Sequence, residues 1–288
     1  MGRRRPARRG GPHLIALELS CVAIVGLYLV VRGRRDADPK AFLLRLLMLT
    51  VASWAAENTV IHAYHFYAYS PEWSLRVDQV PILIVIIWPV VIHSAWDLAK
   101  RLSADRPDRV PLVAAAMVLA DASLIEPIAV KSGLWVWFEP GLFEVPPIGI
   151  LGWAVFAWLC LFVYQHRRLS DGWALLAAPA LTHPILLALW WAALRWVNGT
   201  IDPWPVVGLA WALSLGLAYL AATRPAGARV PVHELLLRVP AAGFFFVLLA
   251  IYGQQAPALI GYTLAFAPPY LVLTARAARA ARAAAPQA

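Results

Sequence analysis

Apolar runs of roughly 20 residues recur along the whole chain, and this feature constrains the fold more than any other. A helix of about that length crosses the hydrocarbon core of a bilayer. Only 14% of the 288 residues are charged, whereas a soluble domain typically has about a quarter. The chain therefore predicts an all-α fold, a polytopic transmembrane helical bundle of eight or nine helices. The predicted spans cover residues 14–31, 42–63, 80–98, 110–131, 146–165, 172–195, 205–222, 239–253 and 257–274.

The same runs predict a single membrane domain over residues 13–275. A basic N-terminal tail precedes it at 1–12, and an Ala- and Arg-rich tail follows at 276–288. Most basic residues between the spans, Arg238 included, fall on one side of the predicted bundle, which is the pattern of cytoplasmic loops. The C-terminal tail is then cytoplasmic. The five arginines of the N-terminal tail fall on the opposite side, so either the first span does not cross or the start is a signal-like segment.

The net charge of +9 does not indicate nucleic-acid binding, because the basic residues lie between spans rather than along a stripe that could follow phosphates. Arginine outnumbers lysine 22 to 3 and alanine is abundant, which favours a GC-rich bacterial genome. We therefore expect the inner membrane of a bacterial cell as the location. Cys21 and Cys160 lie in separate apolar runs and predict neither a disulfide nor a cysteine metal site.

A short internal repeat is predicted, with halves at about 42–98 and 110–165. Each half has a glutamate late in a span, then an aromatic-x-aromatic pair, then Val-Pro with a tryptophan after it. The corresponding residues are Glu57 and Glu126, Tyr67-x-Tyr69 and Trp135-x-Trp137, Val80-Pro81 and Val145-Pro146, Trp88 and Trp153. Both loops emerge on the same face, and repeats of this kind commonly form a site where their halves meet.

Among the acidic residues within predicted spans, Glu57 lies in the second span, and Asp121 and Glu126 lie in the fourth. A carboxylate in a membrane costs several kcal/mol, so it is kept when it is paired, protonated or useful. A carboxylic acid that stays neutral in an apolar site can donate a proton near neutral pH. Asp121, Glu126 and Glu57 are therefore the candidate catalytic residues.

Aromatic residues accompany these acids. Ring faces attract a cation by about 0.5–2 kcal/mol each, so acids beside rings suit protonation of an alkene to a tertiary carbocation, which water or another double bond then captures. An isoprenoid is the kind of substrate that dissolves in a membrane. Tryptophan and tyrosine also form interfacial belts, and belt or packing roles remain open for Trp88 and Trp153. The predicted substrate-binding residues are Tyr67, Tyr69, Trp135, Trp137, Trp153 and Trp88.

The histidines do not predict a metal site. His93 and Asp97 are four residues apart, but without a second histidine cluster they favour a hydrogen-bonded surface pair. His183 precedes Pro184 in the sixth predicted span, where it either lines a cavity or bonds a carbonyl group that the proline frees.

The pattern D-x₄-[DE]-P-x-A-x₃-G-x-W-x-W, followed by V-P-x₅-G-W, resembles the bacterial and archaeal carotenoid biosynthesis membrane proteins. That family includes bisanhydrobacterioruberin hydratase and the carotenoid 1,2-hydratases. Glu57, with Tyr67, Tyr69 and the run from Val80 to Trp88, looks like the family's first half, so the resemblance covers about Glu57–Trp158. The matching positions are Asp121, Glu126, Pro127, Ala129, Gly133, Trp135, Trp137, Val145, Pro146, Gly152 and Trp153.

The resemblance implies cofactor-independent hydration of the terminal double bond of an acyclic carotenoid dissolved in the bilayer. Glu126 or Asp121 is then the general acid, held protonated by the like charge of the other, and Glu57 places or activates water. No metal or cofactor is expected, and other carotenoid-pathway enzymes are candidate partners. The chain departs from the family at Glu126, where aspartate is usual, and near Gly149, where asparagine is usual.

Two other functions remain open. A lycopene-cyclase-like enzyme shares the protonation step but closes a ring instead of adding water. A non-enzymatic transporter or lipid-binding scaffold could use the same acids as a proton relay.

Overall fold

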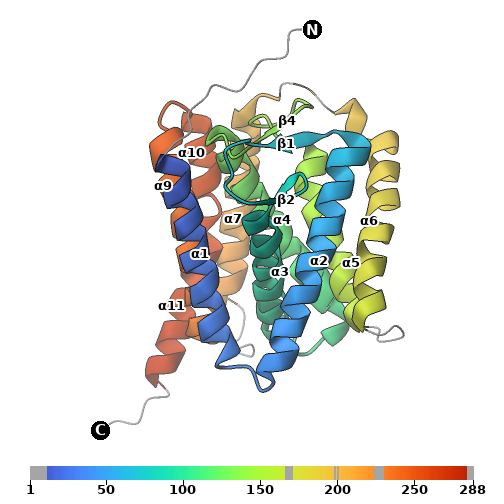
Figure 1. Ribbon diagram of the computed structural model, residues 1–288. Coiled ribbons are helices and arrows are strands. Elements are labelled where there is room, and N and C mark those ends of the chain that lie inside the picture. The colour runs from blue at the N-terminus through green and yellow to red at the C-terminus, as the bar shows by residue number, and fades with distance from the viewer. Residues whose placement is uncertain (1–11, 166–170, 198, 200, 224–229, 284–288) are drawn as a thin grey trace.

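The protein, described here as a computed structural model, is a bundle of long helices (Figure 1). The structure describes residues 12–165, 171–197, 199, 201–223 and 230–283. Within them, 8 helical stretches are long and apolar enough to cross a membrane, and α6 adds a shorter apolar one. The predicted all-α membrane bundle is confirmed. The helices are α1 Pro12–Gly33, α2 Pro39–Tyr64, α3 Ile82–Leu102, η1 Pro107–Arg109, α4 Val110–Lys131, α5 Pro147–Gln165, α6 Asp171–Ala192, η2 Leu194–Trp196, α7 Pro203–Thr223, α8 Val232–Leu236, α9 Val239–Tyr252, α10 Pro257–Leu264 and α11 Ala267–Ala283, and the strands are β1 Tyr67–Tyr69, β2 Arg76–Val77, β3 Val80–Pro81 and β4 Trp135–Trp137.

Proline marks the start of many helices, because the first turn does not need its missing backbone N–H. α2 begins at Pro39, and Asp38 caps it by accepting a backbone hydrogen bond at 3.0 Å. In the two Val-Pro pairs, the proline stands just before the helix rather than in its first turn. Pro81 is the N-cap of α3, and Pro146 directly precedes Pro147, where α5 begins.

α3, α4 and α5 form the centre of the bundle. Their spanning stretches are 56%, 56% and 50% buried, whereas those of α1 and α7 are only 17% buried and so present apolar side chains outward to lipid. Small residues at the central contacts allow the helices to approach closely. Ala114, Ala122, Ala129 and Ala157 are fully buried there.

Two short antiparallel strand pairs cover the end of the bundle where α2 and α4 finish (Figure 1). β1 pairs with β4, and β2 pairs with β3. The Trp73 indole donates to the Leu134 carbonyl at 3.1 Å, which ties the loop after α2 to the loop after α4. α11 ends at the opposite end of the bundle. The β1–β4 ribbon therefore brings the aromatic pairs of both loops over the same helices.

The chain ends agree only in part with the predicted tails. Residues 1–11 of the predicted N-terminal tail lie outside the described residues, and α1 begins at Pro12. α11 continues to Ala283, so the first part of the predicted C-terminal tail is helical, and 284–288 also lie outside the description.

Arg238 lies in the short turn between α8 and α9 and is the N-cap of α9. α8 and α9 form one spanning stretch, Val232–Tyr252, and Arg238 lies within it. Its side chain, 12% exposed, pairs with Asp121 and also donates to the Ser94 hydroxyl at 2.7 Å.

The predicted pairing of His93 with Asp97 is present, with Nδ1 and Oδ2 3.4 Å apart, but the pair is buried rather than on the surface, because α1 covers that side of α3. His93 is 1% exposed, and its Nδ1 lies 3.0 Å from the Tyr28 hydroxyl. Asp97 accepts a hydrogen bond from Arg32 Nε at 2.6 Å. The two residues instead help to join α1 to α3.

Candidate active site

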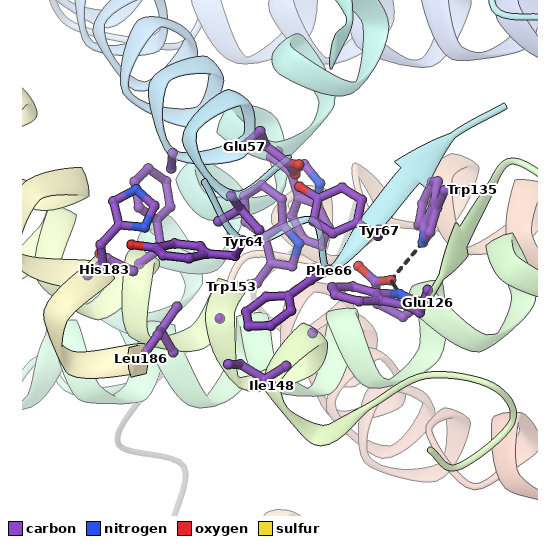
Figure 2. A pocket seen from close by; sticks show the side chains of 18 of the residues that line it. Glu57, Tyr64, Phe66, Tyr67, Glu126, Trp135, Ile148, Trp153, His183 and Leu186 are labelled. Atoms are coloured by element: carbon purple, nitrogen blue, oxygen red, sulfur yellow. Dashed lines mark hydrogen bonds between the residues drawn. The ribbon is translucent and has the colours of Figure 1, made fainter. Parts of the chain in front are cut away.

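A cavity lies beneath the β1–β4 ribbon and between α2, α5 and α6 (Figure 2). Its empty volume is about 770 Å³, measured out to its open side. We call it the aromatic chamber. Glu57, Glu126 and all six predicted substrate-binding residues line it. The lining residues are Ala56, Glu57, Val60, Tyr64, Phe66, Tyr67, Tyr69, Trp88, Glu126, Trp135, Trp137, Ile148, Gly149, Gly152, Trp153, Phe156, Thr182, His183, Leu186 and Leu187.

Glu126 lies at one end of the chamber and is 2% exposed. Its Oε2 accepts hydrogen bonds from the indole N–H groups of Trp135, at 2.8 Å, and Trp137, at 3.1 Å (Figure 2). The turn after α4 makes this arrangement possible. Gly133 adopts φ 75°, a conformation that glycine enters without strain, and the chain reverses into β4. The indole N–H groups of Trp135 and Trp137 therefore point back at α4, the helix that precedes β4 in the chain.

Glu57 lies on α2 and is 4% exposed. The hydroxyl group of Tyr69 donates a hydrogen bond to it. Burial raises the pKa of Tyr69 well above its usual range, and the neighbouring Glu57 raises it further, so Tyr69 remains a donor at neutral pH. The Oε2 atom of Glu57 is buried and has no hydrogen-bond partner among the described residues.

No lysine or arginine is among the lining residues of the chamber. Neither carboxyl group therefore has a cation beside it to balance a negative charge. Glu57 lies seven residues before the end of α2 and Glu126 five before the end of α4, which places both about 7–11 Å below the helix ends. They occupy the same half of the bundle.

Aromatic residues of the two predicted repeat halves contact one another at the chamber, crosswise in the ribbon and at corresponding positions in the tryptophan pair. In the ribbon, Tyr67 is opposite Trp137 and Tyr69 is opposite Trp135. Trp88 stacks on Trp153, with ring centroids 3.6 Å apart and an interplanar angle of 16°. Such reciprocal contacts are what a two-fold relation between halves would produce. The repeat itself stays a prediction.

The burial of Trp88 and Trp153 decides against the belt role that the sequence left open, and it agrees with packing as well as with substrate binding. The two side chains are 3% and 9% exposed and form a wall of the chamber. Neither belongs to a lipid-facing belt. Tyr67 continues the same wall, with its ring centroid 4.6 Å from that of Trp137.

Asp121 is not brought to the chamber. It is five residues before Glu126 on α4, and five residues at about 100° each leave the two side chains about 140° apart around the helix. Asp121 faces α9 instead and pairs with Arg238. The structure therefore does not bring Asp121 and Glu126 into one site, where the like charge of one carboxyl group was predicted to keep the other protonated.

The structure adds lining residues that the sequence did not assign to the site. Phe66 lies just after α2 and stacks on Trp190 with an interplanar angle of 3°. Gly149 has a packing role, because a Cβ atom there would lie 2.5 Å from the Trp137 ring. The Val-Pro pair in the sequence indicated where α5 would begin. Nothing in the sequence indicated that Gly149 would pack against Trp137.

Comparison with known proteins identifies the family. The chain matches the family described as carotenoid biosynthesis protein over residues 10–217. The chain belongs to the carotenoid biosynthesis protein family. This confirms the predicted resemblance at the level of the family and extends it beyond Glu57–Trp158. Neither the curated proteins nor the solved structures with which the chain was compared gave a match.

The matched region covers every helix that lines the chamber, since α2, α3, α4, α5 and α6 all lie within residues 10–217. The helices from α8 onward lie beyond the matched region. As a multi-pass membrane protein of the carotenoid pathway, this family member is expected to act on carotenoid-related molecules in the bilayer.

Proposed function

We propose that the protein hydrates the terminal double bond of an acyclic carotenoid. One observation carries the proposal: two buried carboxyl groups from different helices face one aromatic chamber whose described lining contains no lysine or arginine. Such a chamber can hold a proton on a carboxyl group and deliver it to an alkene. The family supplies the substrate class.

Glu126 is the proposed general acid. When its proton moves to the alkene, a carboxylate remains, and the indole N–H groups of Trp135 and Trp137 already point at its Oε2. A hydrogen bond to a charged group contributes about 1.5–3 kcal/mol. These donors therefore stabilise the state that follows proton transfer more than the state before it, which is how a site lowers a barrier.

The aromatic walls stabilise the tertiary carbocation. Proton addition to the outer carbon of the terminal double bond leaves the positive charge on the carbon that carries the methyl groups. The faces of Tyr67, Trp88, Trp137 and Trp153 border the space in which this charge develops. Each face contributes about 0.5–2 kcal/mol of cation–π attraction.

Glu57 is proposed to place the water that captures the cation. Its Oε2 is buried without a partner among the described residues, so it can accept a hydrogen bond from water. Water addition at the cation gives a tertiary alcohol, and the proton that it loses replaces the one that Glu126 gave. The reaction needs no external cofactor.

The substrate reaches the chamber from the bilayer. Apolar side chains of α5 and α6, among them Ile148, Leu186 and Leu187, border the cavity, and the long polyene can remain among lipid tails while its end group enters. By the pattern of basic loops, the C-terminus lies in the cytoplasm of a bacterial cell and the ribbon on the other face. Other enzymes of the pathway would exchange substrates with it through the membrane.

Cyclisation is the second candidate. The chamber has few polar groups, and Gly149 packs against Trp137 at the place where the resembling family has asparagine. A cation that meets no water reacts with a nearby double bond and closes a ring.

Expression in a lycopene-accumulating bacterium, followed by mass analysis of the pigments, tests the proposal. Gain of one water molecule supports the hydratase. An isomer of unchanged mass indicates a cyclase. Unchanged lycopene in cells that contain the folded protein contradicts both for this substrate and favours a scaffold or transporter.

A further inference from the structure

His183 is an unpaired polar residue of the aromatic chamber. It lies on α6, on the side of the cavity away from Glu126 (Figure 2). Both ring nitrogens are buried and have no hydrogen-bond partner among the described residues. A buried polar group without a partner costs about 1–3 kcal/mol. The ring therefore faces a space that a small hydrogen-bonding molecule would complete.

The other polar groups of the chamber are largely satisfied by the protein. Oε2 of Glu126 accepts two indole hydrogen bonds, and the Tyr69 hydroxyl donates to Glu57. The Thr182 hydroxyl donates to the Ala178 carbonyl at 2.7 Å. Oε2 of Glu57 and the two nitrogens of His183 remain open.

The alternative role that the sequence offered for His183 does not occur. Pro184 removes a backbone N–H from α6, yet neither ring nitrogen of His183 bonds a carbonyl group. The ring packs beside Tyr64, with centroids 5.7 Å apart. Packing of this kind would suit an apolar side chain equally well, so it does not explain an imidazole with two open nitrogens.

We infer that His183 holds the water molecule that captures the carbocation and accepts its proton, an inference that rests on the proposed hydration. The water donates a hydrogen bond to a ring nitrogen while its oxygen faces the cation. A C–O bond then forms at the tertiary carbon, one O–H bond of the water breaks, and the proton moves to the imidazole. The imidazolium returns this proton through solvent to the carboxylate of Glu126. The sum is alkene plus water giving alcohol.

A buried water site needs two or more polar partners. Glu57 and His183 line the same cavity from facing helices, and α2 and α6 are in contact. Together they supply hydrogen-bonding atoms that have no partner among the described residues, in a chamber whose other lining side chains are mostly aromatic or aliphatic.

The test compares wild type with His183→Leu, His183→Asn and His183→Gln in isolated membranes that contain lycopene made in normal water and are then incubated in normal water or in D₂O. His183→Leu is expected to lower the hydrated product by about 10²-fold or more, while deuterium still enters the end groups of the pigment because Glu126 continues to protonate the alkene. Asparagine or glutamine, which keep a hydrogen-bonding atom near one ring nitrogen, should restore hydration in part.

His62→Leu is the matched control. His62 lies on α2 and pairs with exposed Asp78 outside the chamber, at 2.6 Å, so its loss should leave hydration unchanged. Equal hydration by wild type and His183→Leu would overturn the inference and leave the proposed function intact. Loss of deuterium incorporation together with hydration, in a variant of normal thermal stability, would also overturn it. Absence of hydration by wild type would instead contradict the proposed function.

Discussion

At the scale of single residues, Glu126 and Glu57 differ in how their oxygen atoms are satisfied. Two indoles donate to Glu126, whereas Glu57 keeps one oxygen open. This difference assigns proton donation to the first residue and water placement to the second.

Glu126→Gln is therefore expected to reduce turnover by about 10²–10⁴-fold, the usual contribution of a general acid. Glutamine keeps the size of the side chain but has no acidic proton. Glu126→Asp, which restores the residue type usual in the resembling family, should retain much of the activity. The measurement is the rate of product formation in membranes that contain equal amounts of protein.

Glu72→Gln provides the control for this series, because Glu72 is exposed in the loop after β1. It should behave as wild type. Undiminished turnover by Glu126→Gln would remove Glu126 from the chemistry. A double variant with Glu57→Gln should lose little more than Glu126→Gln alone, because water capture, the step that Glu57 serves, follows the protonation that Glu126 provides.

Trp135 tests the stabilisation of the carboxylate. Trp135→Phe keeps an aromatic ring but removes the N–H that donates to Glu126 at 2.8 Å. Loss of one hydrogen bond to a charged group costs about 1.5–3 kcal/mol, so kcat should fall by roughly 10–100-fold with a smaller change in KM. A change in KM alone would show that Trp135 only binds the substrate.

At the scale of elements, spans could be predicted and helix faces could not. The thickness of the bilayer fixes the length of an apolar run, so α1 to α5 agree closely with the predicted spans. Which face of α4 meets which neighbour depends on tertiary packing. The sequence predicted Asp121 and Glu126 to act as one acidic pair, yet their side chains lie on different faces of α4. The antiparallel pairing of β1 with β4 was equally invisible, because three-residue strands have no pattern of their own.

Gly149 of α5 gives a prediction about the contact between an element and the ribbon. Gly149→Ala would place Cβ 2.5 Å from Trp137, so the indole must move away from Glu126. Activity should drop at least about 10-fold although alanine favours the helix by about 1 kcal/mol. Gly216→Ala in α7, where nothing lies within 4 Å of the added Cβ, is the matched control and should retain full activity. Equal activity of both variants would show that the Trp137 position does not matter.

At the scale of the whole molecule, one largely buried ion pair joins the part of the chain that matches the family to the helices beyond it. Asp121 lies in the part of the chain that matches the family, and Arg238 lies beyond it. α9, α10 and α11 pack against α1, α4 and α7. The pair therefore fastens the C-terminal helices to the family core, at a distance from the chamber.

Asp121→Asn leaves the Arg238 guanidinium buried without a counter-charge, and breaking a buried pair in this way costs about 3–5 kcal/mol. Thermal unfolding of the detergent-solubilised protein should occur at clearly lower temperature, while the activity per folded molecule stays near that of wild type. The double variant Asp121→Asn with Arg238→Gln removes the stranded charge and should recover much of the lost stability. The opposite result, an Asp121→Asn protein with normal unfolding temperature and no turnover, would return Asp121 to the chemistry and contradict its assignment as a structural residue.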